Sequence, residues 1–348
     1  MSFQVTVLPS QHQFQANPDQ SVLDAALAAG IVLPYSCRSG ACSTCKAKVV
    51  SGQLEEGAAP SQILSPEEIE QGYALLCQAH AASDLVIESR DVRLATDIQI
   101  RKLPSRVTSI TRPSSDVAVL KLQLPATETF RFYAGQYVEL LLKDGKRRSY
   151  SMANPPHAAE ALELHIRHLP GGLFTDHVFG VGATQMKERE ILRLEGPHGS
   201  FYLREDSDLP IIMLASGTGF APIKSIVEHM IHQGIQRPVT LYWGGRRPAD
   251  LYMHELAQSW SQTVSGFKYI PVISDALPED GWSGRTGFVH KAVMQDHGDL
   301  SGYQVYACGA PIVVDSARRE FTASCKLPAD AFFADSFTSE ADAVAVKG

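Results

Sequence analysis

Three cysteines within nine residues constrain this chain more than any other feature of its sequence. Cys37, Cys42 and Cys45 are spaced C-x4-C-x2-C in LPYSCRSGACSTCKAKVVSG, and Cys77 follows much later in LLCQAH. A disulfide framework would need an oxidising compartment, and a zinc knuckle usually presents two C-x2-C pairs where this stretch has one. Three close cysteines and one distant cysteine match the plant-type [2Fe–2S] pattern, so these four are the expected metal ligands.

The residues between the cysteines support this interpretation. Gly40, Ala41, Ser43 and Thr44 are small, which lets backbone N–H groups approach the sulfides and thiolates of a cluster. Cys325 has no such surroundings and is expected to be an ordinary thiol.

Bulk properties exclude several classes of protein. A length of 348 residues suggests two or three domains, and a net charge of −7 argues against nucleic acid as a partner. The opening MSFQVTVLPSQHQ does not read as a signal peptide, and no run approaches the roughly 20 apolar residues that span a bilayer. Six cysteines without a secretion signal favour thiolates used as ligands or catalysts. We therefore expect a cytoplasmic protein without a membrane partner.

Residues 1–96 predict a small α+β domain. FQVTVL and HQFQA alternate around a turn and predict a β-hairpin. Ser21 at the start and Gly30 at the end delimit a predicted helix, SVLDAALAAG. Ser65 and Glu68 form a predicted capping box around Pro66, and the strand DLVIES closes the region.

This first region is also acidic. It contains ten Asp and Glu residues against five Lys and Arg residues. A soluble surface explains this imbalance, and so does an acidic face that docks against a basic partner or domain.

The remaining chain divides into two further regions. Residues 97–204 hold short alternating strands with turn residues about every 8–12 positions, which predicts an antiparallel β-barrel or sandwich. From residue 205 to 348 the continuous apolar strand LPIIMLAS, the helix APIKSIVEHMIHQG and the strand PVTLYWG alternate. This rhythm predicts an α/β domain with a parallel sheet covered by helices on both faces.

The nucleotide-binding candidates lie in this third region. Gly217, Thr218, Gly219 and Pro222 belong to G-T-G-F-A-P, a turn between a buried strand and a helix, where N-terminal amides can cradle a pyrophosphate. Proline in the last place and no acid after the second strand depart from the standard Rossmann fingerprint. Arg246 and its neighbour Arg247 follow that second strand and could accept the 2′-phosphate of NADPH.

Each region resembles a known family on its own motifs. LPYSCRSGACSTCKAKVVSG with LLCQA resembles chloroplast-type ferredoxins of β-grasp fold. KRRSYSMANPP, HIRHLPGGLFTDHV and LEGPHGSFYL resemble the flavin barrel of the ferredoxin–NADP⁺ reductase superfamily, and G-T-G-F-A-P and YACGAP resemble its nucleotide domain. Taken alone, R-S-Y-S is as well explained by an edge strand after a basic turn.

The superfamily resemblance implies roles for residues of the barrel. Arg148 would pair with the FAD pyrophosphate, Tyr150 would pack on the isoalloxazine, and Ser151 would hydrogen-bond near flavin N5. Gly171, Gly172 and Thr175 open a helix whose N-terminal amides can hold a second phosphate contact.

Three other side chains of the same barrel segment are weaker indications of a flavin site. His165 and Arg167 share a face of their strand, which a solvated surface explains equally well. His168, on the opposite face, is a weaker candidate for flavin contact.

The resemblance also implies roles near the end of the chain. Cys308, followed by Gly309, would sit against the nicotinamide ring, although a buried structural cysteine at a strand end explains it as well. FFADSF resembles the acidic-x-aromatic tail of these enzymes, which would place Asp335 near the flavin and Phe337 over its ring. Because the chain continues past Phe337, the placement of this aromatic residue is open.

The order of the three motif sets resembles three-domain ferredoxin–FAD–NAD reductases. The cysteine loop, IRKLPSRV and YACGAP with FFADSFT are most similar to the CDP-6-deoxy-Δ3,4-glucoseen reductases. The reductase components of soluble methane, phenol and toluene monooxygenases share the order. The resemblance implies hydride transfer from NADH or NADPH to FAD, then single electrons through the cluster to a protein partner docked at the ferredoxin domain. NADH is slightly favoured, because related NADH enzymes also tolerate an arginine at this position.

Several functions remain open from the sequence. The partner is a sugar dehydrase or, alternatively, a mono- or dioxygenase component. A non-catalytic redox sensor or electron carrier is a further alternative. The cytoplasmic subunit of a membrane NADH:quinone pump has a similar three-part order, but that subunit carries an N-terminal transmembrane helix of a kind absent from this sequence.

Overall fold

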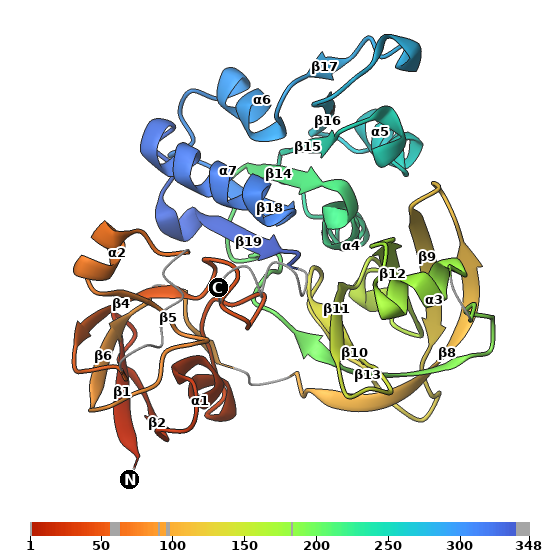
Figure 1. Ribbon diagram of the computed structural model, residues 1–348. Coiled ribbons are helices and arrows are strands. Elements are labelled where there is room, and N and C mark those ends of the chain that lie inside the picture. The colour runs from red at the N-terminus through yellow and green to blue at the C-terminus, as the bar shows by residue number, and fades with distance from the viewer. Residues whose placement is uncertain (1, 56–62, 90, 95–97, 182–183, 339–348) are drawn as a thin grey trace. The chain divides into compact units, whose positions relative to one another are not determined.

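The computed structural model describes residues 2–55, 63–89, 91–94, 98–181 and 184–338 (Figure 1). The chain has three domains in the predicted order: a ferredoxin-like domain, an antiparallel barrel and an α/β domain. The predicted boundary at residues 96 and 97 lies outside the described residues, and the three predicted domain limits stay predictions.

The ferredoxin domain is a mixed sheet packed on a helix. Its strand order is β2-β1-β6-β4-β5, with β1 and β6 parallel and the other pairs antiparallel. Ser21 Oγ accepts the Asp24 N–H at 3.1 Å, so the predicted helix cap is confirmed. The capping box of Ser65 and Glu68 is confirmed as well. The elements are β1 (Phe3–Leu8), β2 (His12–Ala16), α1 (Val22–Ala28), β3 (Ile31–Val32), β4 (Lys46–Ser51), α2 (Pro66–Glu70), β5 (Tyr73–Leu75), β6 (Leu85–Glu88) and β7 (Arg93–Leu94).

The barrel is one six-stranded antiparallel sheet in the order β11-β10-β13-β8-β9-β12. A bridge between Met152 and Leu164 joins its two ends, which closes the sheet. Leucine, valine and isoleucine side chains from alternating positions fill the interior. The elements are β8 (Arg101–Thr111), β9 (Val117–Gln123), β10 (Tyr137–Leu141), β11 (Arg147–Ser151), η1 (Pro156–Ala158), β12 (Ala161–Arg167), α3 (Leu173–Phe179) and β13 (Ile191–His198).

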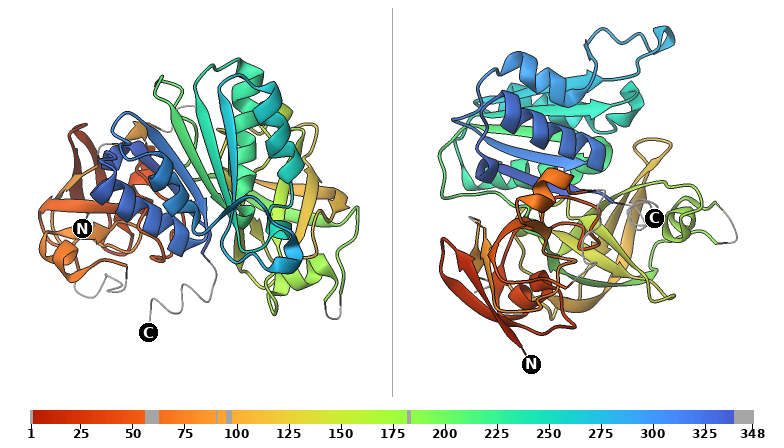
Figure 2. Two further views of the ribbon diagram at one scale, coloured as in Figure 1. Left: turned by 90° about the horizontal axis from the view of Figure 1, so that it is seen from above. Right: turned by 60° about the vertical axis from the view of Figure 1, so that its left-hand side comes forward.

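The α/β domain carries a sheet in the order β17-β16-β15-β14-β18-β19. The pairings from β17 to β18 are parallel, as predicted. Helices α4 and α5 cover one face and α6 and α7 the other (Figure 2). The elements are β14 (Ile211–Ser216), η2 (Gly217–Gly219), α4 (Phe220–Gln233), β15 (Val239–Gly245), η3 (Pro248–Asp250), α5 (His254–Thr263), β16 (Phe267–Ile273), η4 (Pro278–Asp280), β17 (Arg285–Thr286), α6 (Val289–Asp296), β18 (Gln304–Gly309), α7 (Pro311–Ser324), η5 (Ala329–Ala331) and β19 (Phe332–Ser336).

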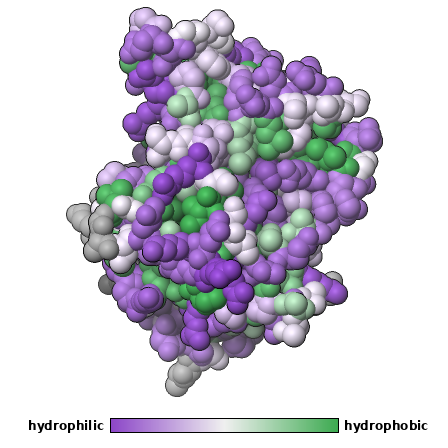
Figure 3. Space-filling model, turned by 90° about the vertical axis from the view of Figure 1, so that its right-hand side faces the viewer, coloured by the Kyte–Doolittle hydropathy of each residue, from purple (hydrophilic) through white to green (hydrophobic). Residues whose placement is uncertain are grey.

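The three domains form two compact units. The barrel and most of the α/β domain make one unit, from Ile98 to His198 and from Tyr202 to Phe333. The other unit contains the ferredoxin domain together with Gly199–Phe201 and the chain from Ala334 onward. On the face shown in Figure 3, hydrophilic side chains predominate and apolar ones lie in separate patches. Among the described residues, no helix has both the length and the apolar character needed to cross a membrane.

Candidate cofactor sites

The four predicted metal ligands meet in one place. Cys42, Cys45 and Cys77 are buried, Cys37 is half-buried, and all four thiols are free. The Sγ atoms of Cys45 and Cys77 lie 3.3 Å apart, so the distant cysteine reaches the loop. Four free thiolate donors held together in this way fit a [2Fe–2S] cluster.

Contacts between these thiols shift their pKa values. A hydrogen bond with the Cys42 thiol lowers the pKa of Cys37 to about 5, and the same bond raises the pKa of Cys42. The contact between Cys45 and Cys77 likewise raises the pKa of Cys45 and lowers that of Cys77. Metal binding would displace the protons that these thiols hold.

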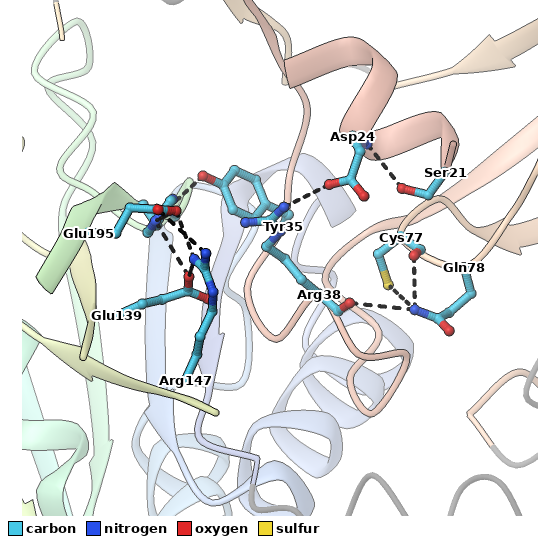
Figure 4. A network of polar contacts seen from close by, with 11 residues as sticks. Ser21, Asp24, Tyr35, Arg38, Cys77, Gln78, Glu139, Arg147 and Glu195 are labelled. Atoms are coloured by element: carbon cyan, nitrogen blue, oxygen red, sulfur yellow. Dashed lines mark hydrogen bonds and ion pairs between the residues drawn. The ribbon is translucent and has the colours of Figure 1, made fainter. Parts of the chain in front are cut away.

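Backbone and amide donors point at the sulfurs. The Ser39 N–H donates to Cys37 Sγ at 3.5 Å. Gln78 Nε2 donates to Cys77 Sγ at 3.7 Å and to the Arg38 carbonyl at 3.4 Å (Figure 4). Arg38, with φ 55°, also forms an ion pair with Asp24 at 2.7 Å, which ties the loop to helix α1. Such outer donors orient ligands and stabilise negative charge on a cluster.

Tyr35 and Ser36, which directly precede Cys37, form hydrogen bonds with residues far away in the sequence. The Tyr35 N–H donates to Ser200 Oγ at 2.8 Å, and the Gly199 N–H donates to Tyr35 Oη at 2.8 Å. Ser36 Oγ donates to Asp335 Oδ1 at 2.6 Å. Nothing in the sequence pattern signals these contacts, because the partners are far apart along the chain.

The predicted flavin residues lie on β11, which pairs with β10. Strand alternation places Arg148 and Tyr150 on one face and Ser151, which is buried, on the other. The Tyr150 ring contacts Phe174 at 5.6 Å between centroids, and burial raises the pKa of its phenol. A half-exposed guanidinium and an aromatic ring on one strand face fit a phosphate and a flat ring system. The individual flavin contacts stay predictions.

Gly171 and Gly172 form the turn before α3, and Thr175, in the first turn of that helix, holds the turn in place. Thr175 Oγ1 donates to the Leu169 carbonyl at 2.8 Å, and a side chain at Gly172 would meet Thr175 Oγ1 at 2.6 Å. Gly171 has φ +81°, a conformation that favours glycine. The turn therefore needs these residues for its own shape, and their predicted phosphate contact is untested.

A buried polar network joins the barrel to the α/β domain. His165 Nε2 lies 2.9 Å from Glu163 Oε1, and His165 Nδ1 lies 2.7 Å from Tyr252 Oη. Burial lowers the pKa of His165 and raises that of Tyr252, so a neutral imidazole donates to the carboxylate and accepts from the phenol. Lys224 Nζ lies 3.2 Å from the same Glu163 oxygen. A solvated face therefore does not describe His165.

Arg167 extends this junction. Its Nη2 lies 2.7 Å from Asp250 Oδ1 and 2.8 Å from Asp116 Oδ2. Asp250 Oδ2 accepts the Arg246 and Arg247 N–H groups at 2.7 and 3.0 Å. A barrel residue thus helps to shape the loop that carries both arginines. His168, by contrast, pairs with Asp176 at 2.8 Å.

The two glycine motifs of the α/β domain interlock. A side chain at Gly219 would lie 2.1 Å from the Cys308 carbonyl oxygen, and one at Gly309 would lie 2.4 Å from the Ser216 carbonyl oxygen. Trp243 Nε1 donates to the Gly217 carbonyl at 3.0 Å. The turn containing Thr218 and the start of α4, which includes Pro222, are held at the carboxyl end of the sheet. Backbone amides there fit a dinucleotide pyrophosphate.

A separate polar cluster lies on the barrel. Glu139, Glu195 and His198 have ligand atoms close enough to hold a metal ion. Arg147 Nη1 lies 2.6 Å from Glu139 Oε2 and 2.8 Å from Glu195 Oε1 (Figure 4). These two carboxylates raise the pKa of Arg147, so a cation of the chain itself already neutralises them.

The chain belongs to the family of iron–sulfur flavoprotein reductases that combine a ferredoxin, an FAD-binding and an NAD-binding domain. Residues 5–82 match the 2Fe-2S iron-sulfur cluster binding domain, residues 104–202 the oxidoreductase FAD-binding domain, and residues 213–319 the oxidoreductase NAD-binding domain. The predicted fold class, enzyme class and cofactors are thereby confirmed.

Relatives fall into two groups. The chain is 39% identical over 337 residues to CDP-6-deoxy-L-threo-D-glycero-4-hexulose-3-dehydrase reductase of Yersinia pseudotuberculosis, covering 97% of this chain and 99% of the relative. It is also 39% identical over 344 residues to the terephthalate 1,2-dioxygenase reductase component 1 of Comamonas sp., covering 97% and 98%. The crystal structure of the Amycolatopsis cytochrome P450 reductase GcoB is similar, with a TM-score of 0.74, 33% identity and coverage of 97% and 99%.

Proposed function

We propose that this protein oxidises NADH and delivers the electrons one at a time to a partner enzyme. The overall step is NADH → NAD⁺ + H⁺ + 2 e⁻, and Cys37, Cys42, Cys45 and Cys77 would hold the [2Fe–2S] cluster that supplies one-electron transfer to the partner. Bound FAD supplies the change from a two-electron hydride to single electrons. The observation that carries the proposal is the convergence of four cysteine thiols in a chain that also holds the R-S-Y-S strand and the G-T-G turn.

The chain's own residues would bind and orient the reactants. Arg148 would hold the FAD pyrophosphate, Tyr150 would cover one face of the ring, and Ser151 would donate near N5. Cys308, at the carboxyl end of β18 and fully buried, would define where the nicotinamide lies. By the resemblance, Phe337, which follows β19 directly, would be an aromatic cover for the flavin ring.

We infer a preference for NADH from the surroundings of the arginine pair. Arg247 makes two hydrogen bonds to Asp280, at 2.7 and 2.6 Å, so its guanidinium is already neutralised. Arg246 is exposed and has an acidic neighbourhood, with Asp250 bound to its backbone N–H. A 2′-phosphate would therefore meet a weaker positive field here than the two arginines suggest.

We propose a sugar dehydrase as the electron acceptor, with an oxygenase component as the second candidate. The two relatives named above have the same identity to this chain, and they represent both candidates. The acceptor would dock at the ferredoxin domain, near the cysteine loop and its acidic surroundings, in the cytoplasm. Purified dehydrase and oxygenase partners should distinguish the two, because only the correct one accepts electrons at low protein concentration and low salt.

Replacing one cluster ligand tests the electron path. Cys42→Ser should leave FAD bound and ferricyanide reduction by NADH intact while cytochrome c reduction falls by more than about 10-fold. Cys325→Ser is the matched control, since this thiol is also buried but lies in the α/β domain. Unchanged cytochrome c reduction in a flavin-loaded Cys42→Ser protein would overturn the proposed path. No steady turnover with ferricyanide would favour a non-catalytic carrier.

A further inference from the structure

The C-terminal segment places a buried carboxylate beside the cysteine loop. Asp335 is 5% exposed, and its neighbours Ala334 and Ser336 are buried as well. These residues belong to the same compact unit as the ferredoxin domain. Burying a carboxylate is unfavourable unless it is hydrogen-bonded, so this placement calls for a specific partner.

That partner is the residue next to a cluster ligand. Ser36 Oγ donates to Asp335 Oδ1 at 2.6 Å, a length typical of an O–H donor facing an ionised carboxylate. The Ser336 N–H donates back to Ser36 Oγ at 3.2 Å. Ser36 is itself 5% exposed and directly precedes Cys37.

The position of Ser36 is specified from its other side too. Tyr35 is 4% exposed, and the Ser200 hydroxyl accepts a hydrogen bond from the Tyr35 N–H at 2.8 Å and donates one to the Tyr35 carbonyl at 3.0 Å. The Gly199 N–H also donates to Tyr35 Oη. A segment held at both residues cannot turn Ser36 away without breaking these bonds. The carboxylate therefore keeps a constant place relative to Cys37.

We propose that Asp335 and Ser36 tune the reduction potential of the cluster that Cys37 helps to hold. A buried negative charge disfavours the addition of an electron nearby, since Coulomb interactions are strong where water is excluded. The Ser36 hydroxyl offsets part of this charge. Asp335 thus acts on the cluster loop, in addition to or in place of the flavin contact implied by the resemblance. The inference rests on the proposed function, because it needs a [2Fe–2S] cluster at the four cysteines.

Redox titration of the full-length holoprotein, monitored by EPR, tests the tuning. Asp335→Asn should make the cluster easier to reduce by about threefold or more in its reduction equilibrium constant, equivalent to about 30 mV. Ser36→Ala should shift the potential in the opposite direction, because the carboxylate loses the hydrogen-bond donor that offsets part of its charge. In the double variant the Ser36→Ala effect should vanish. Asp330→Asn, which removes an exposed carboxylate five residues upstream, should leave the potential unchanged.

The outcomes separate this inference from the proposed function. An unshifted potential in a cluster-loaded Asp335→Asn protein, or a Ser36→Ala effect that persists beside Asp335→Asn, would overturn the tuning alone. A wild-type protein without the EPR signal of a reduced [2Fe–2S] cluster would instead overturn the proposed function.

A second measurement does not depend on the cluster. In the apoprotein, Ser36→Ala should accelerate hydrogen exchange of the Ser336 N–H, whereas Ser36→Thr, which keeps the hydroxyl, should restore slow exchange. Equal exchange rates in all three proteins would contradict the contact on which the tuning depends.

Discussion

Arg246 and Arg247 are neighbours with different surroundings. Arg247 faces Asp280 in a two-bond ion pair, and its pKa is raised chiefly by that hydrogen bond. Arg246 is exposed, and its backbone is tied to Asp250. We therefore expect the carboxylates around this loop, above all Asp280, to matter more for the binding of a 2′-phosphate than the number of arginines. A sequence pattern shows the arginines but not which acid reaches them.

Asp280→Asn should therefore improve the use of NADPH. Freeing the Arg247 guanidinium should raise kcat/KM for NADPH by about fivefold while that for NADH changes little, because only NADPH carries the 2′-phosphate that the guanidinium would bind. Steady-state ferricyanide reduction with each nucleotide measures the ratio. Asp299→Asn is the control, since it also breaks an exposed ion pair, with Lys326, in the same domain. If kcat/KM for NADPH rises no more in Asp280→Asn than in this control, Asp280 does not limit the use of NADPH.

At the scale of elements, the turn after β14 and the end of β18 pack so closely that each needs a glycine where the backbone of the other approaches it. The missing side chain at Gly219 makes room for the Cys308 carbonyl, and Gly309, with φ +128°, makes room for Ser216. The G-T-G and C-G-A-P motifs are therefore one packing unit, in addition to their proposed role in nucleotide binding. A glycine in either motif is explained before any cofactor is considered.

Gly219→Ala should destabilise the α/β domain by about 1–3 kcal/mol through this clash. The same variant should weaken NADH binding, since η2 must shift. Gly298→Ala is the matched control, because a side chain there meets no atom within 4 Å. Thermal unfolding and NADH titration of both variants check the expectation, and equal melting temperatures would show that the backbone moves apart without strain.

The sequence predicted the elements well where the signals are local. Ser21 and Ser65 cap helices through neighbours three residues away, and alternation identified the barrel strands. The cysteine spacing also predicted that the four thiols converge, because three of them lie in one loop. The strand β5 was missed, since its three residues are too few to show a pattern. Burial of His165 and the partners of Ser36 depend on contacts between distant segments, which no local pattern contains.

At the scale of the whole molecule, the Glu163 network links the barrel to the α/β domain. Burial alone would raise the pKa of Glu163, but the His165 hydrogen bond and the Lys224 charge outweigh it and lower the pKa to about 2. The folded state thus favours the ionised carboxylate. This contribution is present above the ordinary glutamate pKa of about 4.3 and is lost as the pH falls towards 2.

Glu163→Gln should lower the free energy of unfolding at pH 7 by about 2–3 kcal/mol. Relative to wild type, this deficit should shrink between about pH 4.5 and pH 2. All three tryptophans lie in the unit that contains Glu163, so urea unfolding followed by their fluorescence reports on it. Glu188→Gln, at an exposed glutamate of the barrel, is the control. A deficit that stays constant from pH 7 to pH 3 would show that ionisation of Glu163 is not the cause.

The contacts of Tyr35 and Ser36 have a consequence for how such chains can be recombined. A gene fragment that ends near residue 97 encodes the four cysteines but omits Gly199, Ser200 and Asp335. Its product would fold without the bonds that orient the entrance to the cysteine loop. In a chimera that takes only its N-terminal domain from another reductase, the cysteine loop would come from one protein and residues 199, 200 and 335, which contact it, from the other. A functional graft would have to carry three separated stretches of the chain, although the motif boundaries suggest one.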